Sequence, residues 1–183
     1  MWNLIIFILA VISIVIFGVV VVGFYTNLNK LKNRVLTAWS YINEEMERKT
    51  ILIDDLVKTI KRTVDHENAL EEVIYANYEL LDTVTVQEIA EANFKLNIAL
   101  DNLYSILENY PNILTNADFL KLTEELRKTE DLIDEDIHLY TEMAYVYNNK
   151  CHTFPGNVVA NYFGFEEAEF FELEMPDNEA IKN

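Results

Sequence analysis

The chain opens with an unbroken hydrophobic run. Leu4 to Val22 is almost entirely Ile, Val, Leu, Phe and Ala, and Trp2 to Asn29 contains no charged side chain. The run is long enough for the ~20 residues that a helix needs to cross a bilayer. Trp2 and Tyr25 stand at its two ends, and such aromatic side chains favour the membrane interface. These features predict a transmembrane helix over residues 1–25.

A different pattern follows from Tyr25 to Glu67, where apolar positions recur three or four residues apart. That spacing places them on one face of a helix, whereas a half-buried strand would alternate with a period of two. We define the N-terminal seam as six of these positions: Leu28, Leu31, Val35, Trp39, Ile42 and Met46. The helix is predicted to continue to about Leu81. A break is suspected near Asp54 and Asp55, because β-branched residues cluster just before them and aspartates favour helix starts.

Two further long helices are indicated by capping patterns and by periodicity. Thr85 and Glu88 form a capping-box pattern, and the helix that they open should end before Pro111. Thr115 and Asp118 suggest a second cap, followed by a heptad-like helix to Cys151. The predicted fold is therefore all-α, with an N-terminal transmembrane helix followed by a long-helix antiparallel bundle. The bundle has three long helices, or four if the first is broken near Asp54.

The segment after the bundle is aromatic and acidic. Residues 154–157, Phe-Pro-Gly-Asn, should stop the last long helix. We expect a bundle over residues 26–153, a docked aromatic tail over 154–174 and a disordered end over 175–183. The aromatic side chains expected to anchor this tail are Phe163, Phe165, Phe170 or Phe171.

Charge is distributed unevenly about a net value of −17. From Glu67 onward acidic residues greatly outnumber basic ones, which argues against binding of nucleic acid. Lys30, Lys32 and Arg34 follow the apolar run directly, whereas no basic side chain precedes it. By the positive-inside bias, a single-pass protein of the cell membrane is expected, with its N-terminus outside and the bundle in the cytoplasm.

The residues with potential chemistry do not assemble into a recognisable site. Cys151 is the single cysteine, which excludes an intramolecular disulfide. A carboxylate-bridged metal site in a bundle requires two Glu-x-x-His pairs, and Glu135 with His138 supplies only one. No glycine-rich phosphate loop is present either. We expect neither a cofactor nor an enzymatic activity, and we keep a ferritin-like metal-binding protein as the alternative.

Three ordered blocks of residues resemble the bacterial LemA family. The first holds Asn33, Arg34, Trp39 and Ser40, followed by His66 and Glu67; the second surrounds Pro111. The third holds Phe154, Pro155, Gly156, Phe163, Gly164, Phe165 and Phe171. The resemblance implies a single-pass membrane protein with an antiparallel helical bundle and no established enzymatic activity. Family members usually carry a proline and an asparagine where this chain has Asp54 and Asp55.

The expected function is that of a membrane-anchored scaffold. A second helix of ~24 residues covers only about 36 Å of the first, which would leave the N-terminal seam without a partner in the chain. The seam is therefore the candidate interaction surface, for copies of the same chain or for an unidentified protein, while the bilayer is the partner of the apolar run.

Overall fold

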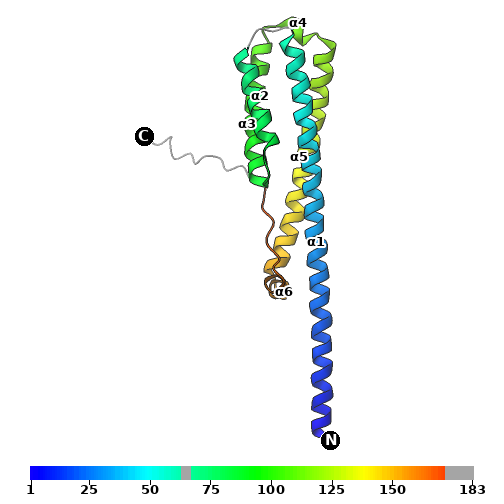
Figure 1. The fold of residues 1–183 in the computed structure, drawn as a ribbon. Coiled ribbons are helices and arrows are strands. Elements are labelled where there is room, and N and C mark those ends of the chain that lie inside the picture. The colour runs from blue at the N-terminus through cyan, green and yellow to red at the C-terminus, as the bar shows by residue number, and fades with distance from the viewer. Residues whose placement is uncertain (63–66, 172–183) are drawn as a thin grey trace, which may run out of the picture. The chain divides into compact units, whose positions relative to one another are not determined.

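The computed structural model describes residues 1–62 and 67–171 of the chain. Within these ranges the chain forms six α-helices and no strand (Figure 1). The helices are α1 (Trp2–Lys61), α2 (Glu67–Leu81), α3 (Val86–Leu107), α4 (Pro111–Leu114), α5 (Ala117–His152) and α6 (Gly156–Phe163). The all-α prediction with a long apolar first helix is confirmed.

Two compact units make up the chain, and the long helices α1 and α5 contribute to both. Unit 1 contains Met1–Trp39 and Leu139–Ala168, and unit 2 contains the described residues of Ser40–His138 together with residues 169–171. Each unit has its own buried apolar side chains, and each is described separately below.

Helix α1 runs for 60 residues without interruption. The break suspected near Asp54 and Asp55 is wrong, because the helix passes through both residues. Lys58 lies 3.1 Å from a carboxylate oxygen of each aspartate, at spacings of four and three residues. These ion pairs suit a helix, so the aspartates support it locally. The helix ends at Lys61 instead, and α2 begins at Glu67.

The N-terminal seam is covered by the chain itself, contrary to the sequence prediction. Leu28 and Val35 are buried in unit 1, and Ile42 and Met46 are buried in unit 2; Leu31 and Trp39 are half-buried. In unit 1 the indole of Trp39 packs on the ring of Tyr140 in α5, with the ring centroids 5.7 Å apart. The prediction considered only the second helix as a cover for α1. Helix α5 has 36 residues, and it packs along α1 in unit 1 (Figure 1).

In unit 2, helix α3 buries one apolar face. Its buried residues include Val86, Ile89, Leu96, Leu100, Leu103 and Leu107. The capping box at its start is confirmed: the Thr85 hydroxyl accepts from the Glu88 amide, and the Glu88 carboxylate accepts from the Thr85 amide. Helix α2 packs against α3, and the amide of Asn77 ties it to α1 through the Thr50 carbonyl at 3.0 Å.

The start of α5 uses a different cap from the predicted one. The side-chain oxygen of Asn116 accepts from the amides of Asp118 and Phe119, at 2.9 and 3.0 Å. Thr115 is instead the C-cap of α4, and its hydroxyl donates to the Pro111 carbonyl at 3.0 Å. Beyond the cap, the heptad positions are buried as expected, including Phe119, Leu126, Ile133, Tyr140, Ala144, Tyr147 and Cys151.

The segment after α5 was predicted as a tail, and part of it forms a helix. A cis peptide bond joins Phe154 to Pro155, and α6 follows directly. Gly156 fits α6 against α5, since a Cβ at that position would lie 2.3 Å from the Lys150 carbonyl oxygen. Gly164 ends α6 at a φ of 69°, a left-handed conformation that glycine adopts without strain.

Candidate functional site

A buried lysine is the most unusual polar feature of unit 2. The Lys49 side chain is only 1% exposed, and its ammonium group lies 2.8 Å from the Asn93 side-chain oxygen. It also lies 2.5 Å from the Asn97 side-chain oxygen and 3.3 Å from a carboxylate oxygen of Glu130. Three helices, α1, α3 and α5, thus supply one polar cluster, and the three acceptors match the three donors of an ammonium group.

This cluster borders a hollow of about 270 Å³. Asp101, Tyr104 and Asp134 line it together with the lysine cluster. Burial lowers the pKa of Lys49, while the Glu130 carboxylate opposes that effect. Burial also raises the pKa of Tyr104 to about 12. The carboxylates outnumber the ammonium group, so the hollow does not favour an anion.

These hydrogen bonds explain how the Lys49 ammonium group can be buried. A buried ammonium group is costly unless it is hydrogen-bonded, so the three helices are held in the register that brings its acceptors together. The sequence carried a signal for this site. Lys49 falls between Met46 and Ile53 in the apolar spacing of α1, and Asn93 occupies an apolar-face position of α3. The contact of Asn93 with Lys49 agrees with that position, and Asn97 joins the cluster one turn farther along α3.

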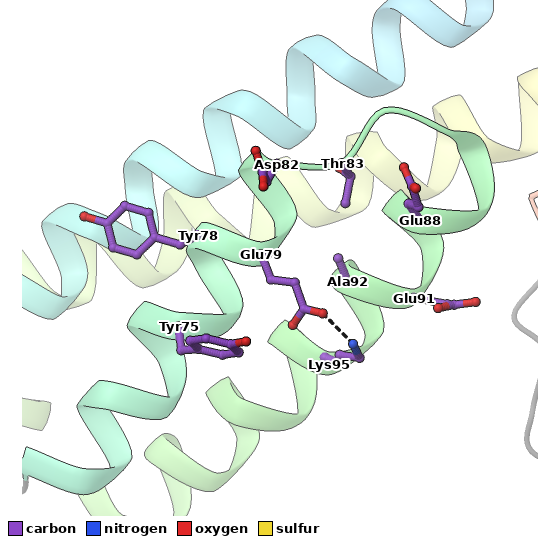
Figure 2. A pocket seen from close by; sticks show the side chains of 9 residues that line it. All are labelled: Tyr75, Tyr78, Glu79, Asp82, Thr83, Glu88, Glu91, Ala92 and Lys95. Atoms are coloured by element: carbon purple, nitrogen blue, oxygen red, sulfur yellow. Dashed lines mark hydrogen bonds and ion pairs between the residues drawn. The ribbon is translucent and has the colours of Figure 1, made fainter.

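A second hollow, of about 420 Å³, lies between α2 and α3 (Figure 2). Tyr75 and Tyr78 line it from α2 and are 73% and 64% exposed. We call this hollow the acidic–aromatic groove; its charged residues are Glu79, Asp82, Glu88, Glu91 and Lys95. The sequence prediction missed it, although an acidic helix with tyrosines three residues apart was the available signal.

The charged side chains of the groove make different interactions. Lys95 and Glu79 form an ion pair at 2.5 Å, visible as the dashed line in Figure 2. The Glu88 carboxylate accepts from the backbone amides of Thr85 and Val84, which lowers its pKa. With four carboxylates and one ammonium group, the groove is complementary to cationic groups. Exposed tyrosine rings add to that preference, because a cation is attracted to an aromatic face.

The predicted membrane-interface residues lie at the two ends of the apolar run of α1, with Trp2 at its start and the other four at its far end. Trp2, Tyr25, Lys30, Lys32 and Arg34 are all exposed along α1. The Tyr25 ring nevertheless contacts two later aromatics, with centroids 4.8 Å from Phe163 and 5.6 Å from Phe165. The Lys150 ammonium lies 5.0 Å from the centroid of the Phe24 ring.

Backbone contacts fix the segment that follows α6. The side chain of Asn148 donates to the Ala168 carbonyl at 2.8 Å and accepts from the Ala168 amide at 2.9 Å. The Tyr147 hydroxyl donates to the Glu166 carbonyl at 2.7 Å. Hydrogen bonds between α5 side chains and the main chain therefore hold this segment to α5. The sequence had indicated only its aromatic rings.

The residues that carried the family resemblance have several structural roles. Asn33, Arg34 and Ser40 are exposed on α1, Pro111 opens α4, and Phe154 is exposed before α6. Pro155 and Phe165 are half-buried, as is Phe171, whereas Gly156 is buried. His66 lies outside the described residues, and Glu67 is the first residue of α2.

Glu135 and His138, the one metal-type pair in the sequence, are both exposed on α5. Among the described residues, no three His, Cys, Asp or Glu side chains gather where they could hold a metal ion. Cys151 is buried, and burial raises the pKa of its thiol. The alternative of a ferritin-like metal site is therefore not favoured.

Over residues 1–62 and 67–171 these features define an all-helical protein whose first helix is long and apolar enough to cross a membrane. The family model of the LemA family matches residues 38–182. Protein LemA of Metamycoplasma hominis is 24% identical over 166 residues, which cover 88% of this chain and 75% of that protein. The chain belongs to the LemA family.

Proposed function

We propose that the protein is a non-enzymatic scaffold anchored in the cell membrane by the first part of α1. The observation that carries the membrane anchor in this proposal is the exposure of the apolar run. No residue in its most apolar stretch is buried within the protein, although α1 continues into packed helical structure. A helix of that composition is stable against hydrocarbon and costly in water.

The charges beside the run support one orientation. Lys30, Lys32 and Arg34 are exposed on α1 just beyond the run, where cytoplasmic flanks carry an excess of basic residues. We infer that the N-terminus lies outside and that the helical body lies in the cytoplasm.

Alkaline extraction of membranes tests the anchor. The full chain should stay with the membrane, whereas replacing Ile8, Ile12 and Val15 with Arg should release it. Each Arg near the middle of a span costs about 2.5–3.5 kcal/mol on insertion scales. The matched control replaces Leu36, Tyr41 and Ile51, which are exposed farther along the same helix, with Arg. Release of the unaltered chain, or retention of the first triple variant, would overturn the proposal.

We further propose that the acidic–aromatic groove is the surface that holds a protein partner. Its exposed tyrosines and its excess of carboxylates suit a segment rich in Lys or Arg. The N-terminal seam does not suit this role, because most of its residues are buried. A second copy of the chain is the other candidate partner, since the segment from Lys30 to Arg34 is basic.

Affinity capture from detergent-solubilised membranes tests the groove. The partner should be lost when Tyr75 and Tyr78 are replaced by Ala, and kept when Tyr145, which is 64% exposed on α5, is replaced. Equal capture by both variants would exclude the groove as the binding surface. Crosslinking in membranes that detects only monomer would exclude self-assembly.

A further inference from the structure

Helix α6 is held against α1 at the point where the apolar run ends. The rings of Phe163 and Phe165 contact Tyr25, and a Cβ on Gly156 would lie 3.8 Å from the Phe24 ring. Lys150, six residues before α6 begins, stacks on the same Phe24 ring. These contacts fix the position of α6 relative to the membrane-spanning helix within unit 1 (Figure 1).

The position of Tyr25 along α1 is close to the edge of the hydrocarbon. Tyr25 follows Val22 by three residues, or about 4.5 Å of helix. The headgroup layer on each side of a bilayer extends roughly 5–7 Å beyond the hydrocarbon. Tyr25 therefore falls within the headgroup layer, and the rings that contact it lie at a similar depth.

The direction of α5 makes α6 the element of unit 1 closest to the bilayer. Tyr140 contacts Trp39, whereas Lys150 contacts Phe24, so α5 runs antiparallel to α1 and approaches the apolar run as it ends. The chain beyond α5 is α6, and residues 2–20 of α1 are all exposed.

One side of α6 presents apolar and aromatic side chains that the protein does not cover. Gly156, Val159 and Ala160 are buried, whereas Val158 and Tyr162 are 56% and 83% exposed. Phe154, four residues before Val158, is 78% exposed. We call Phe154, Val158 and Tyr162 the α6 edge. A spacing of four residues places Val158 and Tyr162 along one side of α6, and Phe154 is exposed just before the helix begins.

The distribution of charge around the α6 edge indicates which layer of a bilayer it would contact. No charged residue occurs from Thr153 to Phe165, although the chain as a whole is strongly acidic. The nearest carboxylates follow at Glu166 and Glu167, and Glu167 pairs with His152 at 3.0 Å. An uncharged edge beside carboxylates favours the neutral zone between headgroups and acyl chains over anionic headgroups.

We propose that the α6 edge inserts into the interface of the bilayer that α1 spans, so that the protein has a second membrane contact. The proposal rests on the proposed membrane anchor and adds a second attachment, which limits rotation and tilt of unit 1 about α1. Tyr162 suits this layer, because its ring is apolar and its hydroxyl reaches water or headgroups.

The test uses the full chain with Cys151→Ser, reconstituted in phosphatidylcholine vesicles and carrying a fluorophore on one introduced cysteine. Three positions are compared: Val158→Cys on the α6 edge, Glu142→Cys at an exposed site of α5, and Val15→Cys inside the span. Quenching by spin-labelled lipid should be several-fold stronger at Val158 than at Glu142, and iodide should show the reverse order. Circular dichroism verifies that each labelled chain keeps its helix content.

The outcomes separate this inference from the membrane anchor. If lipid quenches the label at Val15 while Val158 behaves like Glu142, the α6 edge does not insert and the anchor stands. If lipid does not quench the label at Val15 either, the anchor itself is refuted and the inference falls with it.

Oxidation of the unaltered chain in the same vesicles gives a second measurement. Hydroxyl radicals should modify Tyr162 several-fold less than Tyr145, although Tyr162 is the more exposed of the two in the protein. Modification of Tyr162 equal to or above that of Tyr145 would overturn the proposal without any substitution.

Discussion

Thr129 occupies a fully buried heptad position of α5, and its hydroxyl has no hydrogen-bond partner among the described residues. An unsatisfied hydroxyl lowers stability, so Thr129→Val should raise the free energy of unfolding by about 1 kcal/mol. Urea denaturation measures the change. In the control Thr123→Val, the lost hydroxyl donates to the Phe119 carbonyl at 3.0 Å, so no stabilisation is expected. Destabilisation by Thr129→Val would show that its hydroxyl is satisfied.

The buried Lys49 predicts a particular dependence of stability on pH. Its pKa is lowered by burial, so between that value and the ordinary 10.5 the unfolded chain binds the proton more tightly than the folded chain. The contribution of Lys49 to stability therefore increases as pH rises through this window. The free energy of unfolding should be measured for the unaltered chain and for Lys49→Met. The value for the unaltered chain minus the value for Lys49→Met should be larger at about pH 9.5 than at about pH 7. A difference that stays constant or moves the other way would contradict the burial of the ammonium group.

At the level of single residues, the sequence indicated which side chains are buried better than it indicated which side chains they contact. The spacing of apolar residues along α3 places Asn93 on the buried face, and that inference requires only the period of one helix. Its contact with Lys49 spans 44 residues of sequence, and the third and fourth members of the cluster come from α3 and α5. A partner chosen by packing between helices cannot be deduced from the period of either helix.

Among the elements, α6 depends on one small residue. A Cβ on Gly156 would overlap the Lys150 carbonyl oxygen, a backbone atom that cannot rotate away. Gly156→Ala should therefore loosen α6 from α5, with faster hydrogen exchange at the α6 amides and a loss of about 1–3 kcal/mol. Gly23→Ala is the control, because no atom lies within 4 Å of its Cβ position. Unchanged exchange in Gly156→Ala would contradict this packing.

Helix boundaries were predictable where the signal was local. The Thr85 capping box involves residues three apart and was found as expected. The Asn116 cap was missed in favour of Thr115 because both residue types cap helices and both precede the heptad. Helix α6 was missed because its Pro-Gly start is typical of a turn, and packing against α1 and α5 determines its fold.

Within unit 1, Trp39 tests whether the N-terminal seam is core or an external binding surface. Its indole is half-buried and packs on Tyr140. Trp39→Ala should lower the free energy of unfolding by about 2–3 kcal/mol, somewhat less than for a fully buried tryptophan. Capture of a partner by the folded fraction should be unchanged. Full stability together with loss of the partner would restore the seam as an interaction surface.

For the molecule as a whole, the spacing of apolar residues predicted the helical class, and the uninterrupted apolar run predicted the anchor. Almost no glycine or proline interrupts the middle of the chain, and the apolar run is far from ordinary helix composition. The cover over the seam was not predicted, because it depends on how the last long helix packs on the first. Heptad spacing fixes which face of α5 is buried without identifying the helix that it contacts.

Cysteine labelling in intact cells tests most directly whether α1 crosses the membrane with the helical body in the cytoplasm. In a Cys151→Ser background, Trp2→Cys and Glu142→Cys are treated with a maleimide that cannot cross membranes. We predict that position 2 reacts in intact cells and that position 142 reacts only after lysis. Labelling of position 142 in intact cells would contradict the orientation, and protection of both positions until lysis would contradict the membrane crossing.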